Sequence, residues 1–353
     1  MYLIGMGTAC PPWRYTKAEC WQALQASSWF ERLDCRARLI AERVLQGENG
    51  IDARRLAVER LEAAFDVDPD ALYARFVTHA PQLASDAARR AVSDASIEPA
   101  ALDAVIVSTC TGYLCPGLSG YVIGALGMRA DVLALDLVGQ GCGAALPNLR
   151  AAEALLASRR CAHVLSVCVE VCSAAMYLDN DPGVLVSACL FGDGAGAAVL
   201  STQSASHKRT LEWRRAGSII DPQERDALRF ETRSGMLRNV LTRAVPQLSA
   251  AYAQQVLASV LDAQGLQPSD VTGWIMHAGG RDVLAALRER LDLSEDDLRR
   301  SADVLREYGN LSSAFVFFVL QKAMAESAPG GWWWLASFGA GFSSHGALLR
   351  VSP

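Results

Sequence analysis

Two short stretches, GCGAA at residues 141–145 and GNLSSA at residues 309–314, decide how this chain is organised. Each places one chemically distinctive residue after a glycine and stands before a run of helix-forming residues. Asn310 follows Cys142 by 168 residues. Gly112 and Gly280, the final glycines of STCTG and GWIMHAGG, are also 168 residues apart. Both of these stretches end apparent strands. Equal offsets in the same order indicate an internal duplication.

Further strand-like segments keep this order in both halves. Residues 163–169 correspond to 332–337, and residues 194–200 correspond to 346–351. Strands that alternate with helices are typical of a layered α/β fold. We therefore expect two α/β halves, residues 1–205 and residues 206–353, joined through the polar stretch near 201–210.

Local signals place the remaining elements of the first half. Thr16 is a plausible helix N-cap, and Gly47–Gly50 should interrupt any helix that contains it. The expected elements are strands at 3–9, 103–108 and 132–137 and helices at 16–32, 34–64 with that break, 80–95 and 142–158.

Composition narrows the possible functions. Of 353 residues 51% are apolar, which is typical of a folded globular chain, but no apolar run reaches the roughly 18 residues of a membrane span. A net charge of −5 does not suit nucleic-acid binding, which needs clustered basic residues. The N-terminus lacks a secretory signal pattern, and the ten cysteines form no CxxC pair. We expect reduced thiols and a cytoplasmic location.

The paired stretches also predict where chemistry occurs. In a duplicated fold the two equivalent turns can face each other, which would bring Cys142 and Asn310 together with His277 beside them. A helix start and a neighbouring histidine both lower a thiol pKa, so Cys142 is expected to be a nucleophile for thioester exchange. Taken alone, Cys142 and His277 could be ordinary core residues. The glycine-rich stretches GQGCGA and GDGAGA fit a dinucleotide loop only loosely, and no metal-ligand cluster is expected.

Five motifs in order resemble the chalcone synthase family: VGQGC at 138–142, LFGDGA at 190–195, HAGG at 277–280, YGNLSS at 308–313 and FGAG at 338–341. The chain is thereby identified as similar to type III polyketide synthases, members of the thiolase superfamily. The resemblance covers residues 5–351 and implies a thiolase-like duplicated fold, layered α-β-α-β-α, with two pseudo-twofold-related halves.

The resemblance also implies an activity and its catalytic residues. Cys142 would take the starter acyl group as a thioester. His277 and Asn310 would hold the malonyl thioester carbonyl and stabilise the enolate that forms on loss of CO2. That enolate would then attack the acyl thioester in a Claisen condensation, so the chain would be an acyltransferase.

The same resemblance implies a substrate pocket. Phe191 matches a gatekeeper between the acyl cavity and the pantetheine tunnel, and the loop with Gly339 and Gly341 would share the oxyanion hole with the Cys142 amide. Phe230 stands where plant members carry glycine, and Asn239 where they carry a second gatekeeper phenylalanine. The remaining pocket positions are Cys110, Cys172 and Ala175, in place of small polar residues, and Cys115, which would reach the partner subunit's cavity. This pattern favours an aliphatic starter.

No cofactor or metal is implied, because the thioester carrier supplies the chemistry. The expected partners are an acyl-CoA or acyl-carrier-protein starter, a malonyl thioester and a second copy in a homodimer. The expected product is an alkylpyrone, resorcinol or β-keto acid. Two alternatives remain open: a single-condensation enzyme like ketoacyl-carrier-protein synthase III, and a non-catalytic acyl-binding partner.

Overall fold

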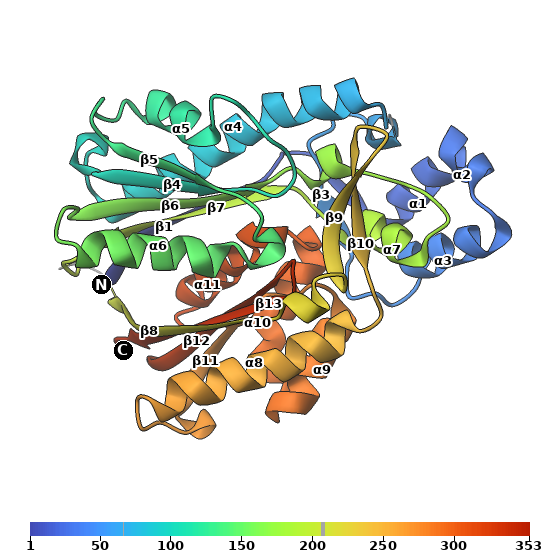
Figure 1. The fold of residues 1–353 in the computed structure, drawn as a ribbon. Helices are drawn as coiled ribbons and strands as arrows, with labels where there is room; N and C mark the ends of the chain where they lie inside the picture. The colour runs from blue at the N-terminus through green and yellow to red at the C-terminus, as the bar shows by residue number, and fades with distance from the viewer. Residues whose placement is uncertain (66, 206–208) are drawn as a thin grey trace.

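A continuous mixed β-sheet forms the framework of the computed structural model, which describes residues 1–65, 67–205 and 209–353 (Figure 1). Within these residues the sheet has nine strands in the order β11-β12-β13-β8-β1-β7-β6-β4-β5. Their bounds are β1 Tyr2–Ala9, β4 Ala104–Ser108, β5 Leu133–Leu137, β6 His163–Glu170, β7 Gly194–Ser201, β8 Leu211–Ile220, β11 Val271–Met276, β12 Gly331–Gly339 and β13 Ser343–Val351.

The sheet consists of two parts with one pairing pattern. In the first part β1 is antiparallel to β7, β7 is antiparallel to β6, and β6 is parallel to β4. In the second part β8 is antiparallel to β13, β13 is antiparallel to β12, and β12 is parallel to β11. The parts join where Tyr2 and Leu3 of β1 pair with β8. This repeated order confirms the duplicated α/β fold.

Helices complete five layers (Figure 1). Helices α4 and α5 cover the outer face of the first sheet part, α8 and α9 cover that of the second, and α6 and α11 lie between the two parts. The helix bounds are α1 Lys17–Ala26, α2 Ser28–Arg32, α3 Cys35–Gln46, α4 Pro69–Ala95, α5 Leu118–Leu126, α6 Ala145–Ala157, α7 Pro182–Leu190, α8 Val245–Asp262, α9 Arg281–Leu291, α10 Glu295–Tyr308 and α11 Phe315–Ala325.

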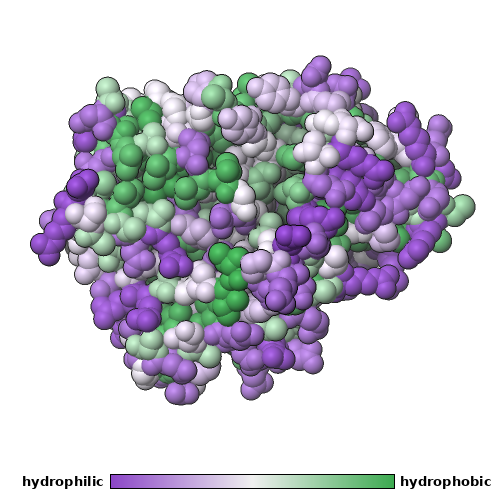
Figure 2. All heavy atoms as spheres, in the orientation of Figure 1, coloured by the Kyte–Doolittle hydropathy of each residue, from purple (hydrophilic) through white to green (hydrophobic). Residues whose placement is uncertain are grey.

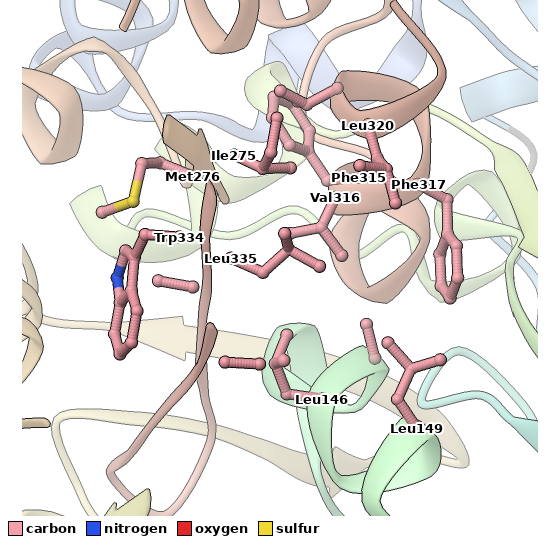
Figure 3. Packing of buried hydrophobic residues seen from close by; sticks show 14 of the residues in the cluster. Leu146, Leu149, Ile275, Met276, Phe315, Val316, Phe317, Leu320, Trp334 and Leu335 are labelled. Carbon is pink, nitrogen blue, oxygen red and sulfur yellow. The ribbon is translucent and has the colours of Figure 1, made fainter. Parts of the chain in front are cut away.

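The central layer is apolar on both sides, which explains why α6 and α11 have so few polar residues. Leu146 and Leu149 of α6 face Val316 and Phe317 of α11 and Leu335 of β12 (Figure 3). All are almost fully buried. Burying each such side chain stabilises the fold by about 1.5–3 kcal/mol, so the two central helices hold the turns that carry Cys142 and Asn310 on a rigid support.

Several predicted boundaries were wrong. Thr16 does cap α1 and forms a capping box with Glu19, but the predicted helix 16–32 breaks at Ser27. After Gln46 the chain forms the short strand β3 (Ala53–Arg55), paired with β2 (Arg14–Thr16), and a 3-10 turn instead of more helix. Helix α4 begins well before residue 80 because the buried face that includes Leu72 and Phe76 outweighs the one hydrogen bond lost at Pro81.

Outside the layers, β9 (Leu228–Arg233) and β10 (Met236–Leu241) form a hairpin that packs against α7. The predicted junction between residues 205 and 206 borders residues 206–208, which lie outside the described residues, so that boundary stays a prediction. Within the described ranges, no helix is both long enough and apolar enough to cross a membrane.

Candidate active site

Cys142 lies in a 3-10 turn, Gly141–Gly143, just before α6. The turn needs its glycines. Gly141 has φ +55°, and a Cβ at Gly143 would lie 3.0 Å from the Cα of Gly339 and 3.2 Å from Cδ2 of His345. Ser337 donates a hydrogen bond to the carbonyl of Gly143 at 3.0 Å. The start of β13 and the end of β12 therefore press directly against the backbone of the cysteine.

The second predicted turn meets the first through Ser312. Its hydroxyl donates to Sγ of Cys142 at 3.3 Å. Asn310 Oδ1 accepts from the Ser312 amide at 2.8 Å, and Asn310 Nδ2 donates to the carbonyl of Gly279 at 3.1 Å. Gly279 is two residues beyond His277. The segments of all three predicted catalytic residues are therefore joined by hydrogen bonds.

Phe191 is tied to the same centre. It forms a parallel β-bridge with Asn310, whose amide donates to the carbonyl of Leu190 at 2.9 Å. The amide of Gly192 in turn donates to the carbonyl of Asn310 at 3.0 Å. Phe191 is thus held beside Asn310 by backbone bonds, which a side-chain substitution at Phe191 would not remove.

His277 follows β11 and is almost completely buried. Its backbone amide donates to the carbonyl of Ala336 at 2.8 Å, and its ring meets Phe315 edge-on with centroids 5.3 Å apart. Nδ1 is buried and has no hydrogen-bond partner among the described residues. Burial lowers the pKa of His277 to about 3, so the resting imidazole is neutral.

The expectation that the pKa of the Cys142 thiol is lowered was wrong. Burial raises the pKa of Cys142 to about 12, and the hydrogen bond from Ser312 offsets only part of this rise. Cys142 also precedes α6 by three residues instead of opening it, so the helix start contributes less than expected. A resting thiolate standing alone is therefore unfavourable, and ionisation requires a partner that accepts the proton.

Glu170 is a central site residue that sequence reasoning missed. This fully buried carboxylate accepts hydrogen bonds from the Cys110 amide at 3.0 Å, Thr111 Oγ1 at 2.9 Å and Ser313 Oγ at 2.5 Å. Burial raises the pKa of Glu170, while these hydrogen bonds lower it. Its Oε1 atom also lies 3.4 Å from Ser312 Oγ, the donor to Cys142. An acidic residue ending the apolar stretch VLSVCV was the available signal.

One cavity collects most of the predicted pocket. Cys172, Ala175, Phe191, Phe230 and Asn239 all line it together with Cys142. Because these side chains form its wall, their sizes limit what can enter the cavity. The lining residues that sequence reasoning missed are Thr111, Ser173, Met176, Tyr177, Val184, Ser187, Ala188 and Ser312.

The other predicted positions do not line the cavity. Cys110 contacts Glu170, with Sγ 3.3 Å from the carboxylate. Gly339 and Gly341 belong to the segment that presses on the Cys142 turn. Cys115 is exposed on the loop between β4 and α5. No cluster of three or more metal-ligating side chains occurs in the part of the chain that the structure describes.

The hairpin that supplies Phe230 and Asn239 is clamped by Arg238. This nearly buried guanidinium contacts Asp179 at 2.8 Å, Glu231 at 2.8 Å and Asp181 at 3.3 Å. Asp179 and Asp181 lie just before α7, whereas Glu231 belongs to β9. The ion cluster therefore fixes the hairpin against the segment that leads into α7, which also lines the cavity.

Comparison with known proteins agrees with this geometry. Residues 60–215 match the family model described as FAE1/Type III polyketide synthase-like protein, and residues 216–352 match that of the C-terminal domain of chalcone and stilbene synthases. A 1,3,6,8-tetrahydroxynaphthalene synthase from Streptomyces peucetius subsp. caesius is 30% identical over 348 residues, which cover 97% of this chain and 91% of that one. The chain belongs to the type III polyketide synthase family.

Other relatives in this family show the breadth of its products. A 3,5-dihydroxyphenylacetyl-CoA synthase from Streptomyces toyocaensis is 32% identical over 69% of this chain, but the match spans only 64% of that relative's length. The α-pyrone synthesis polyketide synthase-like Pks18 of Mycobacterium tuberculosis is 29% identical over 85% of this chain and 80% of its own. These type III polyketide synthases are condensing acyltransferases, and this chain is an enzyme of the same class.

Solved structures confirm the thiolase-like fold. PKS-I from the brown alga Ectocarpus siliculosus superposes with a TM-score of 0.90 at 26% identity, covering 99% of this chain and 97% of that one. The 1,3,6,8-tetrahydroxynaphthalene synthase from Streptomyces coelicolor A3(2) gives a TM-score of 0.88 at 24% identity over the whole of both chains. At that identity the second likeness concerns the fold alone.

Proposed function

We propose that the chain condenses an acyl thioester starter with malonyl units by decarboxylative Claisen chemistry. The observation that carries this proposal is the hydrogen-bonded connection from Cys142 through Ser312 to Asn310. It places a nucleophile beside an amide donor, the two functions that acyl transfer and enolate stabilisation require. Incubation with malonyl-CoA and a series of acyl-CoAs, followed by mass spectrometry of the protein and its products, tests the proposal.

Each residue has a distinct proposed role. Cys142 carries the acyl group. Asn310 Nδ2 donates one hydrogen to the carbonyl of Gly279. Its second hydrogen stabilises the malonyl-derived enolate together with His277. The Cys142 amide and the neighbouring segment with Gly339 and Gly341 supply the oxyanion hole. The thioester carriers bring the activated carbon, so no metal or redox group enters this scheme.

His277 is proposed to take the proton of Cys142. Burial makes a lone thiolate or a lone imidazolium unfavourable, because each loses its hydration. A thiolate next to an imidazolium has no net charge, so burying the pair costs less free energy. In a His277→Gln variant the thiol, whose pKa is raised by burial, has no such acceptor. Its alkylation by iodoacetamide should then rise roughly tenfold per pH unit between about pH 7 and pH 9, because the thiolate fraction follows hydroxide.

The wild-type protein should show a flatter and faster profile over this range. Peptide mass spectrometry assigns the adduct to Cys142, which separates it from the exposed Cys35. Superimposable profiles for the two proteins would remove His277 from this role.

Phe230 is proposed to limit the acyl cavity. In a Phe230→Gly variant the wall recedes and the synthase should accept longer starters or add further malonyl units. The loss of apolar contacts costs at most about 3–5 kcal/mol, so the proteins are compared at a temperature where both are folded. Arg229→Gly, on the opposite face of the same strand, controls for the flexibility of glycine. The same product lengths from the folded Phe230→Gly variant would place the ring outside the acyl path.

A homodimer is proposed on the face that carries β5. This strand ends the sheet, and strands at an exposed edge readily pair with another chain. Large side chains with apolar surface are exposed on β5, α5 and the segments next to them: Tyr113 is 72% and Val138 62% exposed, and Tyr121 and Leu133 are exposed too. Figure 2 shows hydrophobic residues gathered over this part of the surface. Cys115 lies on the same β4–α5 loop as Tyr113, which supports its predicted reach into the partner subunit. Sedimentation equilibrium measures this association.

Substrate delivery and location complete the proposal. The starter and malonyl groups arrive as thioesters of CoA or of an acyl-carrier protein, and the product is an alkylpyrone, a resorcinol or a β-keto acid. The ten cysteines lie within the described ranges and none of them is paired, which supports a reducing compartment such as the cytoplasm.

A further inference from the structure

Asn239 puts a polar group into an otherwise largely apolar wall. It pairs with Phe230 across the β9–β10 hairpin, and both residues line the cavity beside Cys142. The cavity neighbours Val184, Ala188 and Phe191 are apolar. Asn239 itself is only 8% exposed, so its amide is largely removed from bulk water.

The amide is held in place but only half satisfied. Nδ2 donates to Ser187 Oγ of α7 at 2.8 Å, and the Arg238 clamp fixes the hairpin against the segment that leads into α7. Oδ1 is buried and has no hydrogen-bond partner among the residues that the structure describes. A buried carbonyl oxygen without a donor is unfavourable, and leucine would have filled the same space without that cost. The residue is therefore suited to a donor that arrives with the substrate.

An aliphatic starter cannot supply that donor, since its thioester carbonyl only accepts hydrogen bonds. Condensation changes this. Each extension places a methylene between two carbonyls, and moving one proton from that carbon to a carbonyl oxygen forms an enol with an O–H group. No bond to another molecule and no change of oxidation state is involved. The extended chain on Cys142 is the first species in the acyl cavity with a donor of its own.

We propose that Asn239 Oδ1 accepts a hydrogen bond from an enol hydroxyl of the extended β-ketoacyl chain. Asn239 then distinguishes the growing polyketide from the starter and favours further extension over early release. This inference rests on the condensation activity proposed above and adds a residue that determines chain length.

The test compares wild-type protein with Asn239→Leu, which keeps the volume and removes the acceptor. Both receive hexanoyl-CoA and malonyl-CoA, and mass spectrometry gives the ratio of products with two or more extensions to products with one. The loss of one neutral hydrogen bond should lower this ratio roughly three- to tenfold. The losses in hexanoyl loading on Cys142 and in malonyl-CoA decarboxylation should be smaller. Asn239→Asp keeps acceptor oxygens and should retain a ratio nearer to wild type, and thermal melting confirms that each variant is folded.

Two outcomes overturn the inference. An unchanged product ratio in folded Asn239→Leu removes the contact altogether. Equal losses in loading, decarboxylation and extension point instead to the pantetheine arm, which all three steps share. A wild-type protein that neither loads nor extends would refute the proposed function itself, and this result is distinguishable from both.

Discussion

Replacing Cys142 by alanine is expected to abolish the acyl adduct and all product formation. The thiol is the proposed attacking group, and the alanine methyl cannot form a thioester. The change removes one sulfur and one hydrogen bond from Ser312, so the fold should survive with only a small loss of stability. Intact-protein mass spectrometry after incubation with an acyl-CoA measures the adduct directly.

Other thiols require a control. Cys35→Ala alters an exposed cysteine in the first turn of α3, away from the cavity, and should keep the full adduct. Peptide mapping of the wild-type adduct should find it on Cys142 alone. An adduct of undiminished yield on the Cys142→Ala protein would overturn the assignment and direct attention to Cys110 and Cys172.

Asn310→Ala is expected to separate acyl loading from decarboxylation. Loading needs the Cys142 sulfur, which remains, whereas decarboxylation needs a donor to the developing enolate. Loss of one such donor slows the step by roughly 100- to 1,000-fold. Release of CO2 from malonyl-CoA and the acyl adduct on Cys142 are measured in parallel on the same protein.

Asn310 also stabilises the fold, so a second variant is needed to separate this effect from the loss of the donor. Its Oδ1 accepts from the Ser312 amide, so alanine also leaves a buried N–H without a partner at a cost of about 1–3 kcal/mol. Asn310→Asp retains an acceptor for that amide but loses the Nδ2 donor. Both variants should lose decarboxylation, and both should lose stability, since Asn310→Asp sets a buried carboxylate oxygen against the Gly279 carbonyl in place of the Nδ2 donor. Normal CO2 release by either folded variant would contradict the role of the amide donor.

Two equal offsets, together with matching strand-like segments in both halves, were sufficient to predict the duplicated fold and the meeting of two distant turns. Such symmetry is a property of the sequence itself, and it survives in the matching strand orders of the two sheet parts. The N-cap at Thr16 was equally predictable, because capping depends on residues three positions apart. Helix α4 was predicted to start at residue 80, but the buried face that includes Leu72 and Phe76 extends it back to Pro69.

The tertiary structure decided what surrounds these residues. Glu170 gathers donors from two segments that lie about 200 residues apart in the sequence, and no local pattern reveals that an acidic residue will be buried between them. The α7 wall and the Arg238 clamp were likewise invisible, since they depend on the packing of the β9–β10 hairpin. The pKa of Cys142 was wrongly expected to fall because the sequence identifies neighbours but not depth. Motif order and local caps are encoded over short spans or by repetition, whereas desolvation and cavity shape arise only when distant segments pack together.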